Sequence, residues 1–323
     1  MRLSILVVSR TACLVSSMLS SLRDALNLPG EEVEVLCSWN GDPEEEARIE
    51  NSSGYEFLVA NRAPYHFASN MNALADKANG EVLLLINDDV LLDAHSVDAA
   101  LSCLSDHPST GLVGARLRDR EGRLTHAGIL FDRRHSPYHL LDRLVSSEHH
   151  AVLGDPRPVP AATGAAMVIR REHFQILGFN TDYRVCGEDV ELCLALRGQL
   201  ELNVLYCPRF SGEHGGEATR SNEEGQGGNS EDLTRMRGLH ERFLNTTSND
   251  QLRIELAASV AEADALRSLE AHRSHEGQEI SAILAQLRQA TDGKSNHWED
   301  QTHSLQLARL RLEQKLKQAE RGN

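Results

Sequence analysis

The sequence predicts an α/β protein with a largely parallel central sheet flanked by helices. Short β-rich runs alternate with helical stretches through the first 245 residues. Aromatic residues are concentrated in the same region, where thirteen of the fourteen Phe, Tyr and Trp residues precede Asn245. The chain has 323 residues, 40% hydrophobic and 25% charged, which suits one large domain or two ordinary ones.

The first two strands are predicted from apolar runs. Residues 3–8 form the first run, and the polar Arg10 with the serines after it favours a following helix over a secretory signal. Residues 33–37 form the second run, which ends at the turn Asn40-Gly41-Asp42-Pro43. These segments therefore predict the start of a β-α-β arrangement.

The remaining elements of this region follow the same alternation. Residues 57–60 predict a third strand, and a helix over residues 68–78 leads into the apolar central strand at 81–86. Residues 190–197 predict a largely buried helix, and residues 202–206 the last strand of the core. In such sheets, ligands bind at the carboxyl ends of the strands.

The chain is predicted to divide into a globular domain at 1–245 and a helical tail at 246–323. The tail is rich in Ala, Gln, Leu, Glu and Arg and contains no proline, which favours a long helix. Leu and Ala recur at spacings of three and four, which is typical of a coiled coil, but Glu270, Arg273 and Gly277 interrupt this seam. We expect the tail to support a homo-oligomer.

The charge balance excludes some classes of partner. The chain has 33 basic and 48 acidic residues and a formal net charge of −15 at pH 7, which disfavours nucleic acid and anionic membrane surfaces as main partners. No apolar run approaches the roughly 20 residues that span a bilayer. The six cysteines form no Cys-x-x-Cys pair, which favours reduced thiols and a cytoplasmic location. A peripheral position at the inner membrane face stays open.

Two acidic pairs are candidates for chemistry. Asp88 and Asp89 follow the central strand directly, at its carboxyl end, where a divalent cation could offset their repulsion. Glu188 and Asp189 lie in the first turn of the predicted helix at 190–197. Each pair also has a plain explanation, because carboxylates commonly cap helix N-termini.

His214 is a third candidate. It follows the last predicted strand, within a Gly-, Glu- and Ser-rich segment at 212–230 that predicts a mobile loop. A single histidine on such a loop is usually solvated. It becomes a candidate site residue because of its spacing along the sequence from the two acidic pairs.

These residues and several neighbouring motifs resemble family 2 glycosyltransferases with the GT-A fold, in particular bacterial rhamnosyltransferase-like members. The resemblance covers about residues 3–215. Its motifs are Asn70-Met71-Asn72-Ala73-Leu74-Ala75, Asn87-Asp88-Asp89, Gly111-Leu112-Val113-Gly114-Ala115-Arg116-Leu117, Gly122-Arg123-Leu124-Thr125-His126-Ala127-Gly128, Thr163-Gly164-Ala165-Ala166-Met167-Val168-Ile169-Arg170-Arg171, Leu177-Gly178-Phe179 and Glu188-Asp189.

The resemblance implies a role for each candidate. Asp89 takes the position of the acid that binds a divalent metal, Mn²⁺ or Mg²⁺, on the donor diphosphate, and His214 takes another metal-contacting position. Asp88 would serve the ribose or the metal. Asp189 falls at the position of the catalytic base, with Glu188 beside it. Asn87 replaces the first acid of the family's motif, which implies weaker metal binding.

The resemblance also implies a nucleotide pocket, with two departures. Ser9-Arg10-Thr11 stands where Thr-Tyr-Asn is usual, and Trp39 stands where an Asp commonly contacts the base. Trp39 could stack on a nucleobase or simply pack in the core. Asn40 and Asn72 complete the expected donor-binding set.

The predicted function is therefore inverting, metal-dependent transfer of a sugar from a nucleoside diphosphate sugar to an acceptor hydroxyl. The expected acceptor is a glycan or lipid-linked glycan in cell-surface polysaccharide or glycan synthesis. A nucleotidyltransferase should carry a Gly-rich, basic loop after its first strand, and residues 8–12 supply none. A catalytically weak GT-A-like scaffold that acts through its helical tail stays open as the alternative.

Overall fold

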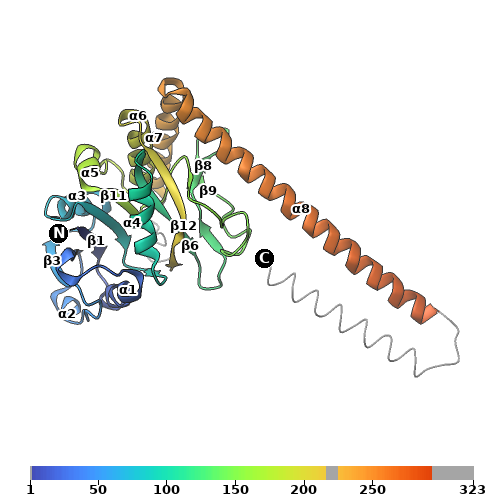
Figure 1. Ribbon diagram of the computed structural model, residues 1–323, viewed down its shortest axis with the longest axis horizontal. Coiled ribbons are helices and arrows are strands. Elements are labelled where there is room, and N and C mark those ends of the chain that lie inside the picture. The colour runs from blue at the N-terminus through green and yellow to red at the C-terminus, as the bar shows by residue number, and fades with distance from the viewer. Residues whose placement is uncertain (1, 216–224, 293–323) are drawn as a thin grey trace.

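The computed structural model describes residues 2–215 and 225–292 of the chain. Within them, one mixed sheet follows the order β10-β12-β6-β11-β4-β1-β2-β3, and β5 pairs with β12 and β7 with β6 outside this order. β8 and β9 form a separate hairpin (Figure 1). The strands are β1 Leu3–Ser9, β2 Val33–Trp39, β3 Glu56–Arg62, β4 Val82–Asn87, β5 Val90–Leu92, β6 Thr110–Arg118, β7 Leu124–His126, β8 Ile129–Phe131, β9 Pro137–His139, β10 Arg157–Pro158, β11 Ala166–Arg170 and β12 Asn203–His214.

Helices connect these strands and cover the sheet. They are α1 Ala12–Ala25, the 3₁₀ turn η1 Gly30–Glu32, α2 Pro43–Glu46, α3 Phe67–Ala75, α4 Ser96–Asp106, α5 Arg171–Leu177, α6 Glu188–Gln199, α7 Gly225–Thr246 and α8 Asn249–Asp292. The predicted strands and helices of the first region are all present, with bounds that differ by a few residues, except that the last strand continues from the predicted end at 206 to His214.

The half of the sheet formed by β4, β1, β2 and β3 is parallel. β1 pairs in parallel with both β2 and β4, and β2 pairs in parallel with β3. The carboxyl ends of these four strands therefore lie along one edge. β11 is antiparallel to β4 and β6, whereas β12 is again parallel to β6.

Two apolar layers cover the faces of the sheet. Alternate residues of β1 point to opposite sides, so Leu6 belongs to one cluster with Met71 of α3, and Ile5 belongs to the other with Val15 and Leu19 of α1. β1 and β2 are buried along their whole length, as expected for strands covered on both faces.

The segment at 212–230 differs from the predicted mobile loop. β12 continues to His214, because its last residues pair antiparallel with the short strand β5, and α7 begins at Gly225. The part of the segment at 216–224 lies outside the described residues. His214 is therefore a strand residue in the sheet, and its prediction as a loop histidine was wrong.

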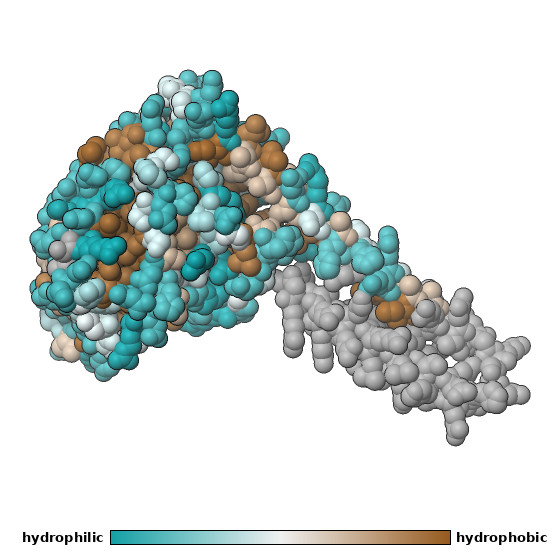
Figure 2. Space-filling view, viewed as in Figure 1, coloured by the Kyte–Doolittle hydropathy of each residue, from teal (hydrophilic) through white to brown (hydrophobic). Residues whose placement is uncertain are grey.

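The helical prediction for the tail is confirmed up to Asp292, where the described residues end. α8 is a continuous helix that leaves the globular part after its first turns (Figure 1). Leu256 and Val260 on α8 are 65% and 50% exposed, although most of the visible surface is hydrophilic (Figure 2). Tail positions beyond Asp292 lie outside the described residues, and self-association stays a prediction. Among the described residues, no helix has the length and apolar character needed to cross a membrane.

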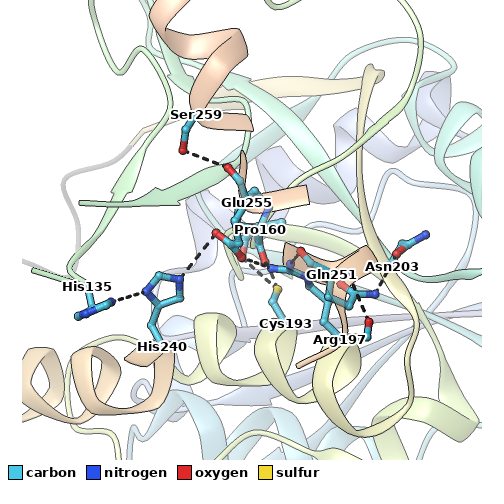
Figure 3. Close-up of polar contacts among 11 residues, drawn as sticks. His135, Pro160, Cys193, Arg197, Asn203, His240, Gln251, Glu255 and Ser259 are labelled. Atoms are coloured by element: carbon cyan, nitrogen blue, oxygen red, sulfur yellow. Dashed lines mark hydrogen bonds and ion pairs between the residues drawn. The ribbon is translucent and has the colours of Figure 1, made fainter. Parts of the chain in front are cut away.

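A buried arginine joins α8 to the globular part (Figure 3). Arg197 of α6 is fully buried. Its guanidinium donates to the Gln251 side chain at 2.8 Å, the Gln251 carbonyl at 2.9 Å, the Glu255 carboxylate at 2.6 Å and the Pro160 carbonyl at 2.8 Å. It also lies 4.7 Å from the ring centre of Phe243 on α7. Because an unpaired buried charge is costly, the first turns of α8 complete the environment that Arg197 needs.

Glu255 extends this network to α7. Its second carboxylate oxygen lies 3.7 Å from Nε2 of His240, whose Nδ1 is 3.1 Å from Nδ1 of His135 (Figure 3). The His240 ring stacks on Phe131. Burial acts to raise the pKa of Glu255, but hydrogen bonds and charge from His240 and Arg197 outweigh it and lower that pKa. The carboxylate is therefore held in its ionised form between three helices.

Candidate functional site

The Asp88-Asp89 pair occupies a two-residue turn between β4 and β5. The Asn87 N–H before the turn donates to the Ala165 carbonyl at 2.9 Å. Val90 after the turn lies opposite His214 in the antiparallel pairing of β5 with β12. Backbone pairing on both sides thus fixes the two acids at the carboxyl end of the central strand.

Asp89 and His214 face each other across this pairing. Oδ1 of Asp89 lies 3.3 Å from Nε2 of His214, and the side chains are 12% and 22% exposed. The Gly215 N–H donates to the Asp89 carbonyl at 3.0 Å, which also holds the end of β12 against the turn. The structure therefore brings together the two residues that the sequence predicts as metal ligands.

The Asp89–His214 pair fits one divalent cation. Two donors about 2.1 Å from an ion and at right angles to each other lie about 3 Å apart, close to the observed separation. Among the described residues, no group of three or more His, Cys, Asp or Glu side chains gathers as a metal site. The pair leaves most coordination positions for other oxygens, which is usual where a metal binds with substrate phosphates.

Asp88 points to the first strand. Its Oδ2 accepts a hydrogen bond from the Ser9 hydroxyl at 2.5 Å. Burial raises the pKa of Asp88 to about 6, and the charge of Asp89 adds to this, while the Ser9 hydrogen bond and the charge of Arg10 oppose it. The acidic turn therefore contacts the end of β1 through Asp88 and Ser9, with the charge of Arg10 close by.

The other acidic pair begins α6. Gly187 caps the helix with φ of +119°, a left-handed conformation that favours glycine. Oδ2 of Asp189 accepts from the Gly164 N–H at 2.8 Å, and Oδ1 accepts from the Val190 N–H at 2.8 Å. Both oxygens of Asp189 are thus oriented by backbone donors, with lone pairs remaining for a further partner.

The turn at 163–165 joins the two acidic pairs. Its Ala165 carbonyl accepts from Asn87 beside the first pair, while its Gly164 N–H donates to Asp189 of the second. The Thr163 N–H donates to Nε2 of the buried His126 at 3.3 Å. Asp189 is therefore held next to the carboxyl end of β4, on the other side of this turn.

Tyr65 was not predicted as a site residue. It follows β3 and is 48% exposed. Partial burial and the charges of Glu188, Asp88 and Asp89 raise its pKa, while Arg10 opposes them, which places the ring within electrostatic reach of both acidic pairs. The signal available in the sequence was an aromatic residue a few positions after the strand predicted at 57–60.

Three expected donor-binding residues have structural contacts. Trp39 is 2% exposed and its indole N–H donates to the Asp42 carbonyl at 3.2 Å, which favours the packing interpretation. Asn72 exchanges two hydrogen bonds with the backbone of Phe179, at 2.8 and 2.9 Å. Asn40 donates to the Ala63 carbonyl from its side chain and to the Ser9 carbonyl from its backbone.

No family model matches the chain. The uncharacterized protein y4gI of Sinorhizobium fredii is 29% identical over 183 residues, which are 55% of this chain and 20% of that protein. The O-antigen biosynthesis protein RfbC of Myxococcus xanthus is 33% identical over 141 residues, which are 42% of this chain and 11% of that protein. The chain thus matches a fifth or less of the length of these relatives.

A solved structure extends the comparison to the whole fold. The mannosyltransferase PcManGT from Pyrobaculum calidifontis, in complex with GDP-Man and Mn²⁺, superposes with a TM-score of 0.57 at 15% identity. The superposition covers 96% of this chain and 86% of that chain. The fold is therefore of the GT-A type, with a C-terminal helical region, as the sequence predicts.

Proposed function

We propose that the chain is an inverting glycosyltransferase that uses a nucleoside diphosphate sugar and a divalent cation. The observation that carries the proposal is the approach of Asp89 to His214, with Asp189 held nearby through the turn at 163–165. Acidic side chains are thereby gathered near the carboxyl ends of the parallel strands, where this architecture binds ligands.

Asp189 would act as the general base. Its carboxylate is aimed by the N–H groups of Gly164 and Val190, and it would accept the proton of the acceptor hydroxyl as that oxygen attacks the sugar. Attack from the face opposite the leaving nucleotide would give inversion. Glu188 lies beside it and would assist in placing the acceptor.

Asp89 and His214 would hold the divalent cation, Mn²⁺ or Mg²⁺. When bound, this cation would supply positive charge that offsets the charge developing on the departing diphosphate. Ser9, Arg10, Asp88 and Asn40 would form the nucleotide side, and the exposed ring of Tyr65 would cover it.

The acceptor is proposed to be a glycan or lipid-linked glycan in cell-surface polysaccharide synthesis. The name of the Myxococcus xanthus relative supports this class of pathway. All six cysteines are free thiols, which fits a reducing compartment, so we place the reaction in the cytoplasm.

Nucleotide release measured with UDP-, GDP- and dTDP-sugars tests the proposal. The full chain with Mn²⁺ should release nucleotide from at least one donor, and release should fall on chelation and with Asp89→Ala. Arg209→Ala would serve as the control, because Arg209 is exposed on β12 and belongs to none of the proposed ligand or base positions. A folded protein that neither binds nor cleaves any donor would contradict the proposal.

Such a negative result would support the scaffold alternative. The exposure of Leu256 and Val260 on α8 favours that alternative, because apolar side chains on an extended helix can contact another chain. Asn87 in place of an acid points in the same direction. A measurement of nucleotide binding distinguishes the two functions, because a glycosyltransferase must bind its donor and a scaffold need not.

A further inference from the structure

A buried carboxylate on α7 contacts the backbone just before the proposed base. Asp232 is 2% exposed. Its Oδ2 accepts from the N–H groups of Arg184, Val185 and Cys186 at 3.1, 2.7 and 3.2 Å, and its Oδ1 lies 3.3 Å from the Arg184 nitrogen. Three consecutive backbone donors thus converge on a single side chain from a different element.

This contact is adjacent to Gly187, the residue that caps the N-terminus of α6. Gly187 follows the three donors directly and has φ of +119°. A Cβ at Gly187 would lie 2.6 Å from Sδ of Met236 and 2.7 Å from the Tyr183 ring. The backbone therefore has little freedom between the Asp232 contact and the first turn of α6, where Asp189 lies.

Further contacts join the same two segments. Arg235 of α7 pairs with Asp182 at 3.1 Å and lies 5.5 Å from the centre of the Tyr183 ring. These contacts are at the surface, since the side chains of Arg235 and Asp182 are 42% and 63% exposed. The buried interaction of α7 with this loop is that of Asp232 and Met236.

We infer that Asp232 is a positioning residue for the proposed base Asp189. The inference rests on the proposed function for its catalytic meaning. Consecutive N–H groups form a site for an anion, and a carboxylate in that site fixes the path of the backbone. Through the residues 184–187 this fixes the start of α6, and hence the direction of the Asp189 carboxylate toward the acceptor.

The position of α7 gives the contact a second consequence. α7 is the first described helix after β12, the strand that ends at the proposed metal ligand His214. Asp232 thus links the helix that follows the metal side of the site to the loop that precedes the base.

The test compares three variants of the full chain. Asp232→Ala removes all acceptors for the three donors, Asp232→Asn keeps one acceptor oxygen without the charge, and Glu231→Gln is the control. Glu231 is next to Asp232 on α7, but its side chain is 72% exposed and lies 3.6 Å from the Arg184 guanidinium. Hydrogen exchange at residues 184–187 and steady-state transfer kinetics are measured for each folded variant.

Asp232→Ala should lower kcat per folded molecule by about tenfold or more while changing the donor KM less than about twofold, because small displacements of a reacting group cost rate. The amides at 184–186 should exchange faster in the same variant. Asp232→Asn should lie between Asp232→Ala and the wild type, and Glu231→Gln should match the wild type. If Asp232→Ala does not fold, the kinetics of Asp232→Asn decide.

Two results would overturn the inference in different ways. Unchanged kcat with faster exchange at 184–186 would mean that Asp232 holds the loop but does not position the base. Wild-type protein with slow exchange at these amides and no turnover of any donor would refute the proposed function itself, and the catalytic meaning of the contact with it.

Discussion

The guanidinium of Arg197 and the carboxylate of Glu255 form a 2.6 Å ion pair between α6 of the globular part and α8 of the tail. Arg197 is fully buried in this pair and Glu255 is 16% exposed. The tail therefore begins with residues that belong energetically to the globular part.

Replacing Glu255 should destabilise the folded protein. Glu255→Ala leaves a buried guanidinium without its charged partner, and such losses cost about 3–5 kcal/mol of unfolding free energy when the site is fully buried. Asp264→Ala is the matched control on the same helix, because Asp264 pairs with Arg267 at the surface and should change stability by less than about 1 kcal/mol. Urea unfolding measures both, and equal effects would contradict the role of the buried pair.

The same carboxylate should make stability depend on acid pH. The pKa of Glu255 is lowered in the folded state, so its ionised form contributes stability above the ordinary glutamate pKa of about 4.3. This contribution is lost as pH falls through the lowered pKa. The stability difference between wild type and Glu255→Gln, measured by urea unfolding, should therefore shrink below about pH 4. A difference independent of pH would be inconsistent with the lowered pKa.

Two truncations of the tail should differ in their effect on stability, depending on whether they keep the partners of Arg197. A chain ending at Asn245 lacks Gln251 and Glu255 and should melt at lower temperature, because Arg197 loses its tail partners. A chain ending at Ser274 keeps these contacts and should melt like the full chain. Light scattering on the chain that ends at Ser274 then tests self-association. If it has the same number of subunits as the full chain, the residues after Ser274 are not needed for assembly.

Changing Asp189 should separate catalysis from helix capping. Asp189→Asn keeps an oxygen for the Gly164 N–H but cannot take up a proton as a carboxylate does, so turnover should fall about 10²–10⁴-fold with donor affinity retained. Loss of a capping interaction alone costs about 1 kcal/mol of stability. Glu188→Gln should reduce turnover less. Near-normal turnover in Asp189→Asn, at saturating donor and metal, would rule out the assignment.

His214 should contribute to cation affinity. His214→Ala removes one neutral ligand, and the half-saturating metal concentration for turnover should rise roughly tenfold or more, with Mn²⁺ more effective than Ca²⁺. His275→Ala is the control, because His275 is an exposed residue of α8 that pairs with Glu279. Identical metal titrations for wild type and His214→Ala would show that His214 is not a ligand.

The sheet and the position of the acidic turn could be predicted from the sequence. β1, β2 and β4 are buried on both faces and therefore have nearly continuous apolar sequences. The change from Ile86 to the polar residues after it also shows where the central strand ends. These sequence patterns depend only on whether each residue of a strand is buried or exposed, so they can be read without knowing the partners of the strand.

Contacts between distant segments could not be predicted in this way. His214 meets Asp89 because the three-residue strand β5 pairs with the end of β12, and a strand that short has no periodic pattern. Arg197 lies within a stretch predicted as buried helix, but its partners follow 54 and 58 residues later. Asn72 was expected to bind the donor, yet both the nitrogen and the oxygen of its side-chain amide form hydrogen bonds with the Phe179 backbone.

The length of α8 gives the protein a fixed reach. Its 44 residues extend about 66 Å at the helical rise of about 1.5 Å per residue. Because the Arg197 network holds one end against the globular part, the axis of the helix sets a direction as well as a distance. The end of α8 at Asp292 is thereby kept tens of ångströms from the Arg197 network, so α8 would work as a spacer between the globular part and a partner bound near that end.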